Sequence, residues 1–333
     1  MEWGQVLNRE FAARKPNHLI RIHDSRPDPL SVDLAGIKLK NPILLASGTA
    51  GYGAELSSVM DLGTVGGIIL KSVTEKSRKG NPSPRIWETP CGMLNSIGLE
   101  NMGVDALIDE VLPSLDGSGV TVLASIAGDT VDEYGRLAAR LDGAPGVSAL
   151  EVNVSCPNVE KGGIHFGAEA EATRAVASIV RENCALSFFV KLSAAVSDVA
   201  RIALAARSGG ASGLSLINTI PGLAVDPSTR RPRLGAVTGG LSGPAIKPIA
   251  LKAIWDCYSA TGLPIIGCGG IYDVDDVCEF LVAGSTAVAI GTVTFQDPER
   301  ALEIIEALPR ALSALGVESP GELTGSLRVW REA

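Results

Sequence analysis

Four polar side chains that could do chemistry lie close together in residues 151–163, which read EVNVSCPNVEKGG. An apolar, β-branched run changes there to Asn153, Ser155, Cys156 and Asn158. A simple turn would need only glycine, proline or aspartate, so a thiol between two amides indicates a function. With a pKa near 8.5, about 3% of a free thiol is thiolate at neutral pH, which suits a positioned general base. The amides could hold a polar, planar substrate.

Two lysines stand inside otherwise apolar runs: Lys71 in GGIILKSV and Lys191 in SFFVKLS. A buried ammonium group is costly unless it is paired, so both lysines need partners. If both face one site, they suggest an anionic ligand or an electron-rich ring. The alternative is that each lysine extends its ammonium group to solvent at the edge of the fold.

Glycine-rich turns end two further apolar runs. Gly269–Gly270 follow the apolar run LPIIGC, and Gly291–Thr292 follow TAVAI; these are the last two of eight such runs in the chain. In barrel enzymes the loops at this location frequently bind phosphate through their backbone amides. A glycine pair alone is a weak indication because it also ends ordinary helices and strands, but the location strengthens it.

Eight short apolar runs recur along the chain, with helical patterns such as EAEATRAVASIVREN between them. The predicted strands are 42–47, 66–73, 120–126, 149–155, 187–193, 212–218, 263–269 and 286–291. Apolar strands interleaved with helices predict an α/β fold with a parallel sheet covered on both faces. Eight units, and no early GxGxxG, favour a (β/α)8 TIM barrel over a doubly wound sheet.

The polar residues then fall at the carboxyl ends of the strands, where barrels keep their active sites. Two connections at this face, 74–119 and 219–262, are long, and we expect each to contain a helix plus functional loop residues. Residues 30–41 predict an N-terminal hairpin that could plug the barrel floor. We expect an N-terminal arm over 1–29 and a single domain over 30–333.

Composition excludes several classes of function. The net charge is −8 and the pI is about 5.1, which argues against a nucleic-acid partner because phosphate binding needs clustered Lys and Arg. No apolar run approaches the roughly 20 residues of a membrane span. The first 25 residues lack the uninterrupted apolar segment of a secretory signal, so we expect a cytoplasmic protein without a membrane partner.

Six cysteines and three histidines limit the metal chemistry. No cysteine pair has CxxC spacing, so we expect neither an iron–sulfur cluster nor a four-thiolate zinc site in this chain. A histidine-based metal centre is equally unexpected. Cys184, Cys257 and Cys278 occur in helix-like patterns and are predicted to be structural. For Cys268, in GCGG, both packing and lining a cofactor loop remain open.

Several motifs match a known family in their order and in their positions at strand ends. They are ASGT, LKSVTEKSRKGNPSPRIWETPCGMLNSIGLEN, EVNVSCPNVEKGG, INT, TGGLSGPAIKP, IIGCGGI and AIGT. Together they resemble dihydroorotate dehydrogenase, over about residues 28–315. The resemblance is closest to the class 1, type B catalytic subunit, whose flavin is FMN.

The resemblance implies a role for each matching residue. Cys156 would be the base that takes the C5 proton of dihydroorotate, while the C6 hydride passes to FMN and orotate is formed. The implied substrate contacts are Lys71, Asn95, Asn153, Asn158, Asn218 and Thr219. The implied FMN contacts are Ala46, Ser47, Lys71, Ser72, Asn153, Lys191, Ile217, Gly243, Gly269, Gly270, Gly291 and Thr292. The loop after Cys156 would close as a lid.

The resemblance also implies partners. Type B subunits form a homodimer and work with an electron-transfer subunit that carries FAD and a [2Fe–2S] centre and reduces NAD⁺. This chain departs from the family pattern at Ala194 and Ala195, where the family reads KLSPN, and at Met102, where proline is common. Two alternatives are an FMN barrel acting on another cyclic amide, such as a dihydropyrimidine, and a flavin-free phosphate-binding lyase or isomerase.

Overall fold

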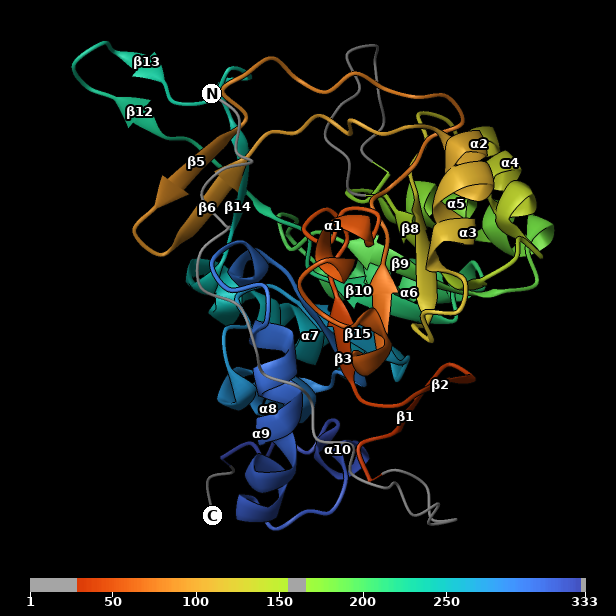
Figure 1. Ribbon diagram of the computed structural model, residues 1–333, viewed down its shortest axis with the longest axis vertical. Coiled ribbons are helices and arrows are strands. Elements are labelled where there is room, and N and C mark those ends of the chain that lie inside the picture. The colour runs from red at the N-terminus through yellow and green to blue at the C-terminus, as the bar shows by residue number, and fades with distance from the viewer. Residues whose placement is uncertain (1–28, 155–165, 331–333) are drawn as a thin grey trace.

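A closed barrel of eight parallel strands forms the centre of the protein, in a computed structural model that describes residues 29–154 and 166–330 (Figure 1). Around the barrel the order is β10, β15, β16, β3, β4, β7, β8 and β9. Their bounds are β3 Ile43–Leu45, β4 Gly67–Ile69, β7 Val122–Ile126, β8 Val147–Asn153, β9 Ser187–Leu192, β10 Gly213–Leu216, β15 Ile265–Cys268 and β16 Ala287–Ile290. Each predicted apolar run contributes one barrel strand, so the TIM-barrel prediction is confirmed.

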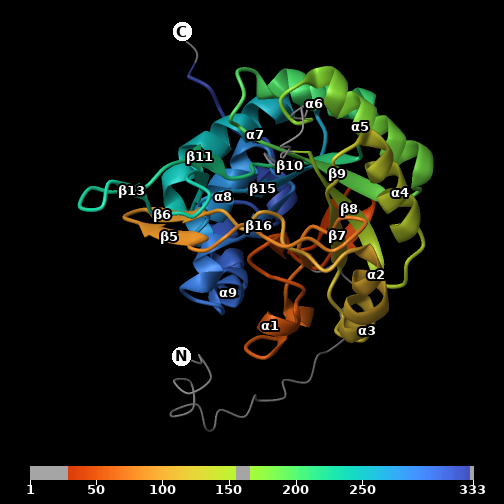
Figure 2. The same cartoon turned by 90° about the horizontal axis from the view of Figure 1, so that it is seen from above.

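Helices cover the outside of the barrel, and α4, α5, α6 and α7 follow one another around it (Figure 2). The longer helices are α4 Val131–Leu141, α5 Ala170–Asn183, α6 Val199–Ser208, α7 Lys247–Thr261, α8 Val274–Ala283 and α9 Arg300–Ala314. The short ones are α1 Ala54–Ser57, η1 Leu62–Thr64, α2 Val104–Ala106, η2 Leu107–Val111, α3 Leu112–Leu115, η3 Pro244–Ile246, η4 Thr292–Phe295 and α10 Pro320–Leu323. Within the described part of the chain, no helix is both long and apolar enough to cross a membrane.

Polar caps explain where several of these helices begin. Thr130 accepts a hydrogen bond from the Glu133 amide at the start of α4, and Asp198 accepts one from the Arg201 amide at the start of α6. Asp273 begins α8 with a reciprocal capping box to Asp276. Each cap satisfies amides that the first helical turn leaves without partners.

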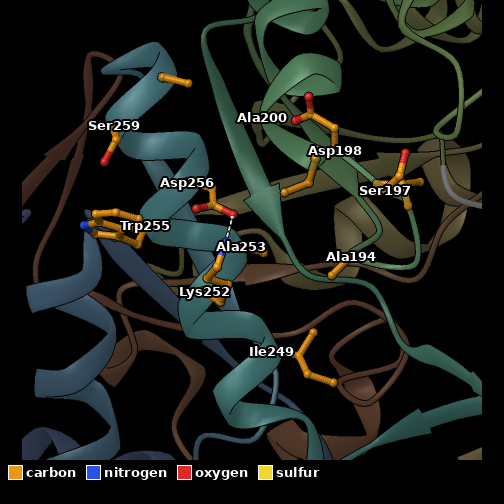
Figure 3. Close-up of a pocket in the computed structure, with 13 residues that line it drawn as sticks. Ala194, Ser197, Asp198, Ala200, Ile249, Lys252, Ala253, Trp255, Asp256 and Ser259 are labelled. Carbon is orange, nitrogen blue, oxygen red and sulfur yellow. Dashed lines mark hydrogen bonds and ion pairs between the residues drawn. The ribbon is translucent and has the colours of Figure 1, made fainter.

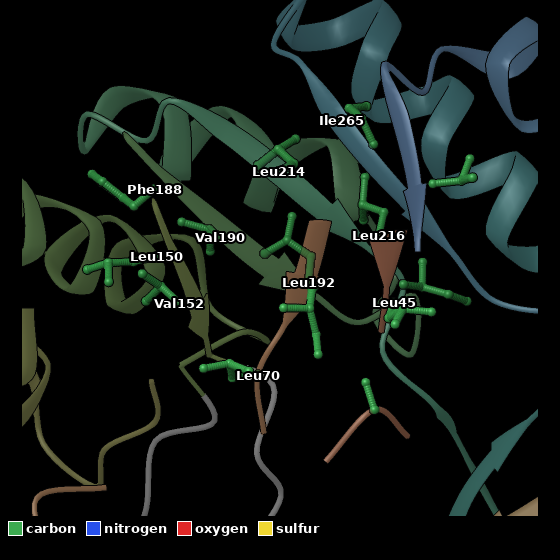
Figure 4. Packing of buried hydrophobic residues seen from close by; sticks show 14 of the residues in the cluster. Leu45, Leu70, Leu150, Val152, Phe188, Val190, Leu192, Leu214, Leu216 and Ile265 are labelled. Atoms are coloured by element: carbon green, nitrogen blue, oxygen red, sulfur yellow. The ribbon is translucent and has the colours of Figure 1, made fainter. Parts of the chain in front are cut away.

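Two apolar layers pack on opposite sides of the barrel wall. One alternate set of strand residues points outward and packs beneath the helices, as Leu150, Val152 and Val190 do in Figure 4. The other set, which includes Leu123 and Phe189, points into the barrel. Because successive strand residues face opposite sides, both sets must be apolar, which produces the continuous apolar runs of the sequence.

The barrel floor is closed by the predicted N-terminal hairpin. Its strands, β1 Val32–Leu34 and β2 Ile37–Leu39, pair antiparallel. Leu34 and Leu39 are buried in the same cluster as the inward-facing barrel residues. The hairpin therefore fills one end of the barrel and leaves the opposite end for ligands.

At that opposite end, the two long connections form strands that sequence analysis did not predict (Figure 1). They build a four-stranded antiparallel sheet in the order β11 Ile220–Gly222, β14 Gly239–Ser242, β6 Gly92–Asn95 and β5 Ile86–Thr89, next to a small hairpin of β12 Val225–Asp226 and β13 Arg231–Pro232. Each connection also contains the expected helix, in α2 to α3 and in α7, but part of what was expected to be loop forms these strands. Strands of two to four residues are too short to show an alternating pattern, and glycine is rare in ordinary strands.

Candidate functional site

A cavity of about 890 Å³ lies between the carboxyl ends of the barrel strands and the four-stranded sheet. It is lined by every described residue that the resemblance implicates: Ala46, Ser47, Lys71, Ser72, Asn95, Asn153, Lys191, Ile217, Asn218, Thr219, Gly243, Gly269, Gly270, Gly291 and Thr292. Small-molecule sites typically measure about 300–1,000 Å³, so this cavity has room for a ligand of cofactor size. Residues far apart in the sequence thus converge on one site.

Two of the predicted site residues, Cys156 and Asn158, lie outside the described residues, and so does the predicted lid segment. The strand that leads to them is described as far as Val154. Asn153 ends β8 and lines the cavity. The roles assigned to Cys156 and Asn158 stay predictions.

The inside of the barrel changes from apolar to polar just below the cavity. Along β8, Ala149, Glu151 and Asn153 point to the same side, because alternate residues share a face. Ala149 belongs to the apolar floor and Asn153 lines the cavity, so Glu151 lies between them. A carboxylate in that position needs charged or hydrogen-bonding partners.

Lys191 of β9 and two hydroxyls provide these partners. The Lys191 Nζ lies 3.3 Å from Glu151 Oε1, and Glu151 is fully buried at 0% exposure. Ser125 Oγ donates to Oε1 at 3.2 Å, and Ser215 Oγ donates to Oε2 at 2.8 Å. Burial, the largest single influence, lowers the pKa of Lys191, but the charge of Glu151, the nearby Cys268 and the hydrogen bond to Glu151 together outweigh burial and raise the pKa above the usual value. Lys191 therefore carries a positive charge at neutral pH.

A chain of hydrogen bonds connects this ion pair to other cavity residues. Ser125 Oγ and Ser72 Oγ are 2.7 Å apart, and Asn153 Nδ2 donates to Ser72 Oγ at 3.4 Å. Ser72 and Asn153 follow or end their strands and both line the cavity. The network therefore runs from the buried carboxylate to two predicted cofactor contacts.

Lys71, the second predicted lysine, differs from Lys191. It lines the cavity, and no residue in the described ranges forms an ion pair with it. The sequence predicts a partner for each lysine, and among the described residues an ion-pair partner is found for Lys191 alone. An ammonium group in this position can attract an anionic ligand.

The predicted amide and hydroxyl contacts come from both walls of the cavity. Asn95 of β6 donates to the Gly240 carbonyl at 3.4 Å, and Asn218 accepts from the Thr219 amide at 2.8 Å. On the other side, Thr292 Oγ1 donates to Ser242 Oγ at 2.9 Å, which ties the loop after β16 to the four-stranded sheet. The sheet therefore both covers the site and anchors part of it.

The glycine turns after β15 and β16 differ in what requires them. Gly270 has φ +89°, and a Cβ there would lie 2.8 Å from the Lys247 Cβ, so the protein itself needs glycine at this position. At Gly291 the closest atom to a Cβ would be the Ala46 Cβ at 3.5 Å, an ordinary contact. No described atom would crowd a Cβ at 291, so a ligand has room to approach this backbone closely.

Cys268, left open by the sequence, is half-buried, packs against the inward-facing barrel residues and also lines the cavity. Burial raises the pKa of its thiol, and the nearby Lys191 charge opposes this only in part. Cys184, Cys257 and Cys278 are buried in the helical shell, as predicted.

A second hollow of about 670 Å³ lies on the outer surface between α7 and the loop before α6 (Figure 3). Three of its charged side chains make structural contacts within the protein: Lys252 pairs with Asp256 at 2.6 Å, and Asp198 caps α6. Ala194, one of the departures from the family pattern, faces this hollow, whereas the preceding Ser193 lines the main cavity. We therefore assign the chemistry to the cavity at the barrel mouth.

Three residues of the site were missed in the sequence: Glu151, Ser125 and Ser215. Each lies inside a buried strand, where the apolar neighbours conceal it. A usable signal existed for Glu151, because an acid two residues before Asn153 must face the same side of its strand. No comparable signal distinguishes Ser125 or Ser215 from ordinary small core residues.

Comparisons with known proteins agree with this geometry. Residues 29–312 match the family model for dihydroorotate dehydrogenase. The chain is 51% identical over 296 residues to the dihydroorotate dehydrogenase B (NAD(+)) catalytic subunit of Desulforudis audaxviator, covering 89% of this chain and 96% of the relative. It is 49% identical to the protein of the same name from Geobacter sp. strain M21, covering 91% of this chain and 99% of the relative. The chain belongs to the dihydroorotate dehydrogenase family and is therefore an oxidoreductase.

Proposed function

We propose that the cavity holds FMN and dihydroorotate side by side and that the chain oxidises dihydroorotate to orotate, a step of pyrimidine biosynthesis. The proposal depends on one observation: Lys71, several amides and several hydroxyls line a single cavity, and the charged Lys191 lies at its floor. The names of these relatives support the same reaction, with NAD⁺ as the final acceptor.

The residues present fit an FMN molecule. Gly269, Gly270 and Gly291 line the cavity and can offer backbone amides to a phosphate, and Ala46 and Ile217 offer apolar contact to a ring. The Lys191 ammonium can balance negative charge on the ring system. When bound, FMN would supply the acceptor for the C6 hydride of the substrate.

The remaining groups fit the substrate. Lys71 lines the cavity without an ion-pair partner among the described residues, and we assign it to the substrate carboxylate. Asn95, Asn153 and Asn218 can satisfy the carbonyl and NH groups of the ring, because each amide both donates and accepts. We assign removal of the C5 proton to Cys156, as the resemblance implies.

The flavin-free alternative finds little support at Lys191. A lysine that forms a Schiff base must lose its proton at working pH, but Glu151 raises the pKa of Lys191. The alternative of another cyclic amide uses the same groups, so the choice of substrate rests on experiment.

The test is anaerobic mixing of purified protein with dihydroorotate while the visible flavin absorbance is recorded. We expect a yellow protein whose absorbance band is lost on mixing. A yellow protein that dihydropyrimidine bleaches and dihydroorotate does not would support the other cyclic amide. A colourless protein that takes up no FMN would refute flavin chemistry altogether.

We also propose a homodimer and an electron-transfer subunit carrying FAD and a [2Fe–2S] centre. The catalytic-subunit names of the relatives support a partner. Exposed Ile86, Trp87, Leu223 and Val225 on the four-stranded sheet and its hairpin offer an apolar surface for association. We propose a cytoplasmic location, where the five described cysteines would stay reduced. Light scattering of the chain with and without the partner tests the assembly.

A further inference from the structure

The Glu151–Lys191 ion pair is the most deeply buried charge pair of the described structure. The Glu151 side chain has 0% exposure and the Lys191 side chain 10%. Replacing such a pair by apolar residues often leaves a protein equally stable or more stable, so stability alone does not explain it. Because Glu151 lies directly below Lys191, which lines the cavity, we expect Glu151 to have a function in the ligand site.

The geometry restricts what Glu151 can do. Apart from the Lys191 ammonium, its oxygens accept from the hydroxyls of Ser125 and Ser215. Ser125 lies on β7, which pairs with β8, and Ser215 lies on β10, on the far side of β9. The partners of the Glu151 carboxylate thus come from three strands other than β8. Glu151 itself does not line the cavity. Glu151 can reach a ligand only through Lys191 or through the Ser125–Ser72 hydroxyls.

We propose that Glu151 is a positioning residue that holds the Lys191 ammonium, protonated and fixed, at the floor of the cavity. This inference rests on the proposed function, in which Lys191 faces bound FMN. The titratable groups that face Lys191 among the described residues are Glu151 on β8 and Cys268 on β15, while Lys71 lines the same cavity. Cys268 stays neutral because burial raises its pKa, so Glu151 is the one described anion beside this lysine.

The pair has a consequence for flavin chemistry. A lysine that keeps its proton across the working pH range presents a constant positive charge to the cavity. Without Glu151, burial would lower the pKa of Lys191, and its charge would vary with pH. The carboxylate also cancels part of the field of the ammonium, so its removal leaves a net positive charge at low pH.

The experiment is a double-mutant cycle of Glu151→Gln and Lys191→Met, read out as the reduction potential of bound FMN at several pH values. In the Lys191 background we expect Glu151→Gln to shift the potential upward at low pH and to lose this shift as pH rises. In the Lys191→Met background the same substitution should cause no shift. Ser215→Ala, which removes one hydrogen bond and no charge, should keep the wild-type pH profile.

An equal shift in both backgrounds, or none in either, would overturn the inference, because Glu151 would then not act through Lys191. Each single variant leaves one buried charge alone and can fail to fold, whereas the double variant removes both charges. Unfolding of the FMN-free wild type, the two single variants and the double variant therefore provides a second readout. Additive losses of stability would also show that Glu151 and Lys191 do not act as a pair.

Glu151→Asp, which keeps the charge but withdraws it by one methylene, should give an intermediate pH profile. A wild-type protein that binds no FMN would refute the proposed function instead, and the unfolding cycle would still test the pair.

Discussion

Lys191 shows how a single charged residue can be placed below a ligand cavity. Its ammonium is tolerated because Glu151 lies 3.3 Å away and two serines complete the hydrogen bonding of that carboxylate. Lys71 lies in the same cavity without a described ion-pair partner. We therefore expect the two lysines to have different functions: Lys191 provides a fixed charge, and Lys71 contacts an anionic ligand.

Cys156→Ala should keep the yellow colour and lose most turnover. A positioned general base contributes about 10²–10⁴ to rate, and alanine cannot accept the proton. Steady-state oxidation of dihydroorotate by an artificial acceptor measures the loss. Cys278→Ala, which changes a buried cysteine in α8, is the matched control and should retain turnover. Unchanged turnover in Cys156→Ala would remove the thiol from the mechanism.

Buried thiols should make the protein sensitive to alkaline pH. Burial raises the pKa of Cys184 to about 11 and of Cys257 to about 12. Because both values lie above those of unfolded thiols, this stabilisation is complete below pH 8.5–9 and is lost as the pH rises towards 11 and 12. Alkylation at pH 8 should label exposed Cys91 and spare these two until the protein unfolds. Peptide mapping after labelling would reveal early modification of Cys184 or Cys257, which would contradict the prediction.

At the scale of elements, the hairpin of β1 and β2 determines which end of the barrel is open. Leu34 and Leu39 close the floor, and the four-stranded sheet covers part of the mouth. The cavity at the barrel mouth therefore lies between the polar layer of Glu151 and Lys191 and this sheet. The floor contributes stability, while the mouth contributes binding groups.

Leu39→Ala should destabilise the protein by about 2–5 kcal/mol, because it removes a fully buried side chain and leaves a void in the floor. Chemical denaturation measures the change in the free energy of unfolding. Lys38→Ala, at an exposed position of the same strand, should change stability by no more than about 0.5 kcal/mol. An equal effect of both substitutions would mean that the hairpin does not plug the barrel.

At the scale of the whole molecule, the barrel closes by pairing strands from opposite ends of the chain. β16 pairs with β3, with Val288 opposite Ile43, so the first and last strands of the barrel are neighbours. Breaking the barrel anywhere therefore exposes both apolar layers. We propose that residues 30–333 form one folding unit.

Urea should consequently unfold the chain in a single transition when followed by both circular dichroism and tryptophan fluorescence. Cooperative loss of secondary and tertiary structure is expected because the two halves share one closed sheet. The FMN-free protein should be used, since bound ligand shifts the midpoint. Two separated transitions would show that the chain contains independently stable parts.

The barrel and the location of its site could be predicted from the sequence. Strands buried on both faces must be apolar throughout, so eight runs such as Val122–Ile126 are visible without a structure. Parallel strands also bring their carboxyl ends to one face, so Lys71, Asn153 and Asn218 had to lie near one another.

Only the tertiary structure decided which charges meet and what covers them. The contact between Glu151 and Lys191 depends on the register of β8 and β9, in which Lys191 stands opposite Asn153. Register follows from the stagger of the closed barrel, to which every strand contributes, so spacing within one segment cannot predict it. The four-stranded sheet was hidden for a similar reason, because its very short strands are stabilised by partners more than a hundred residues away, as in the pairing of β6 with β14.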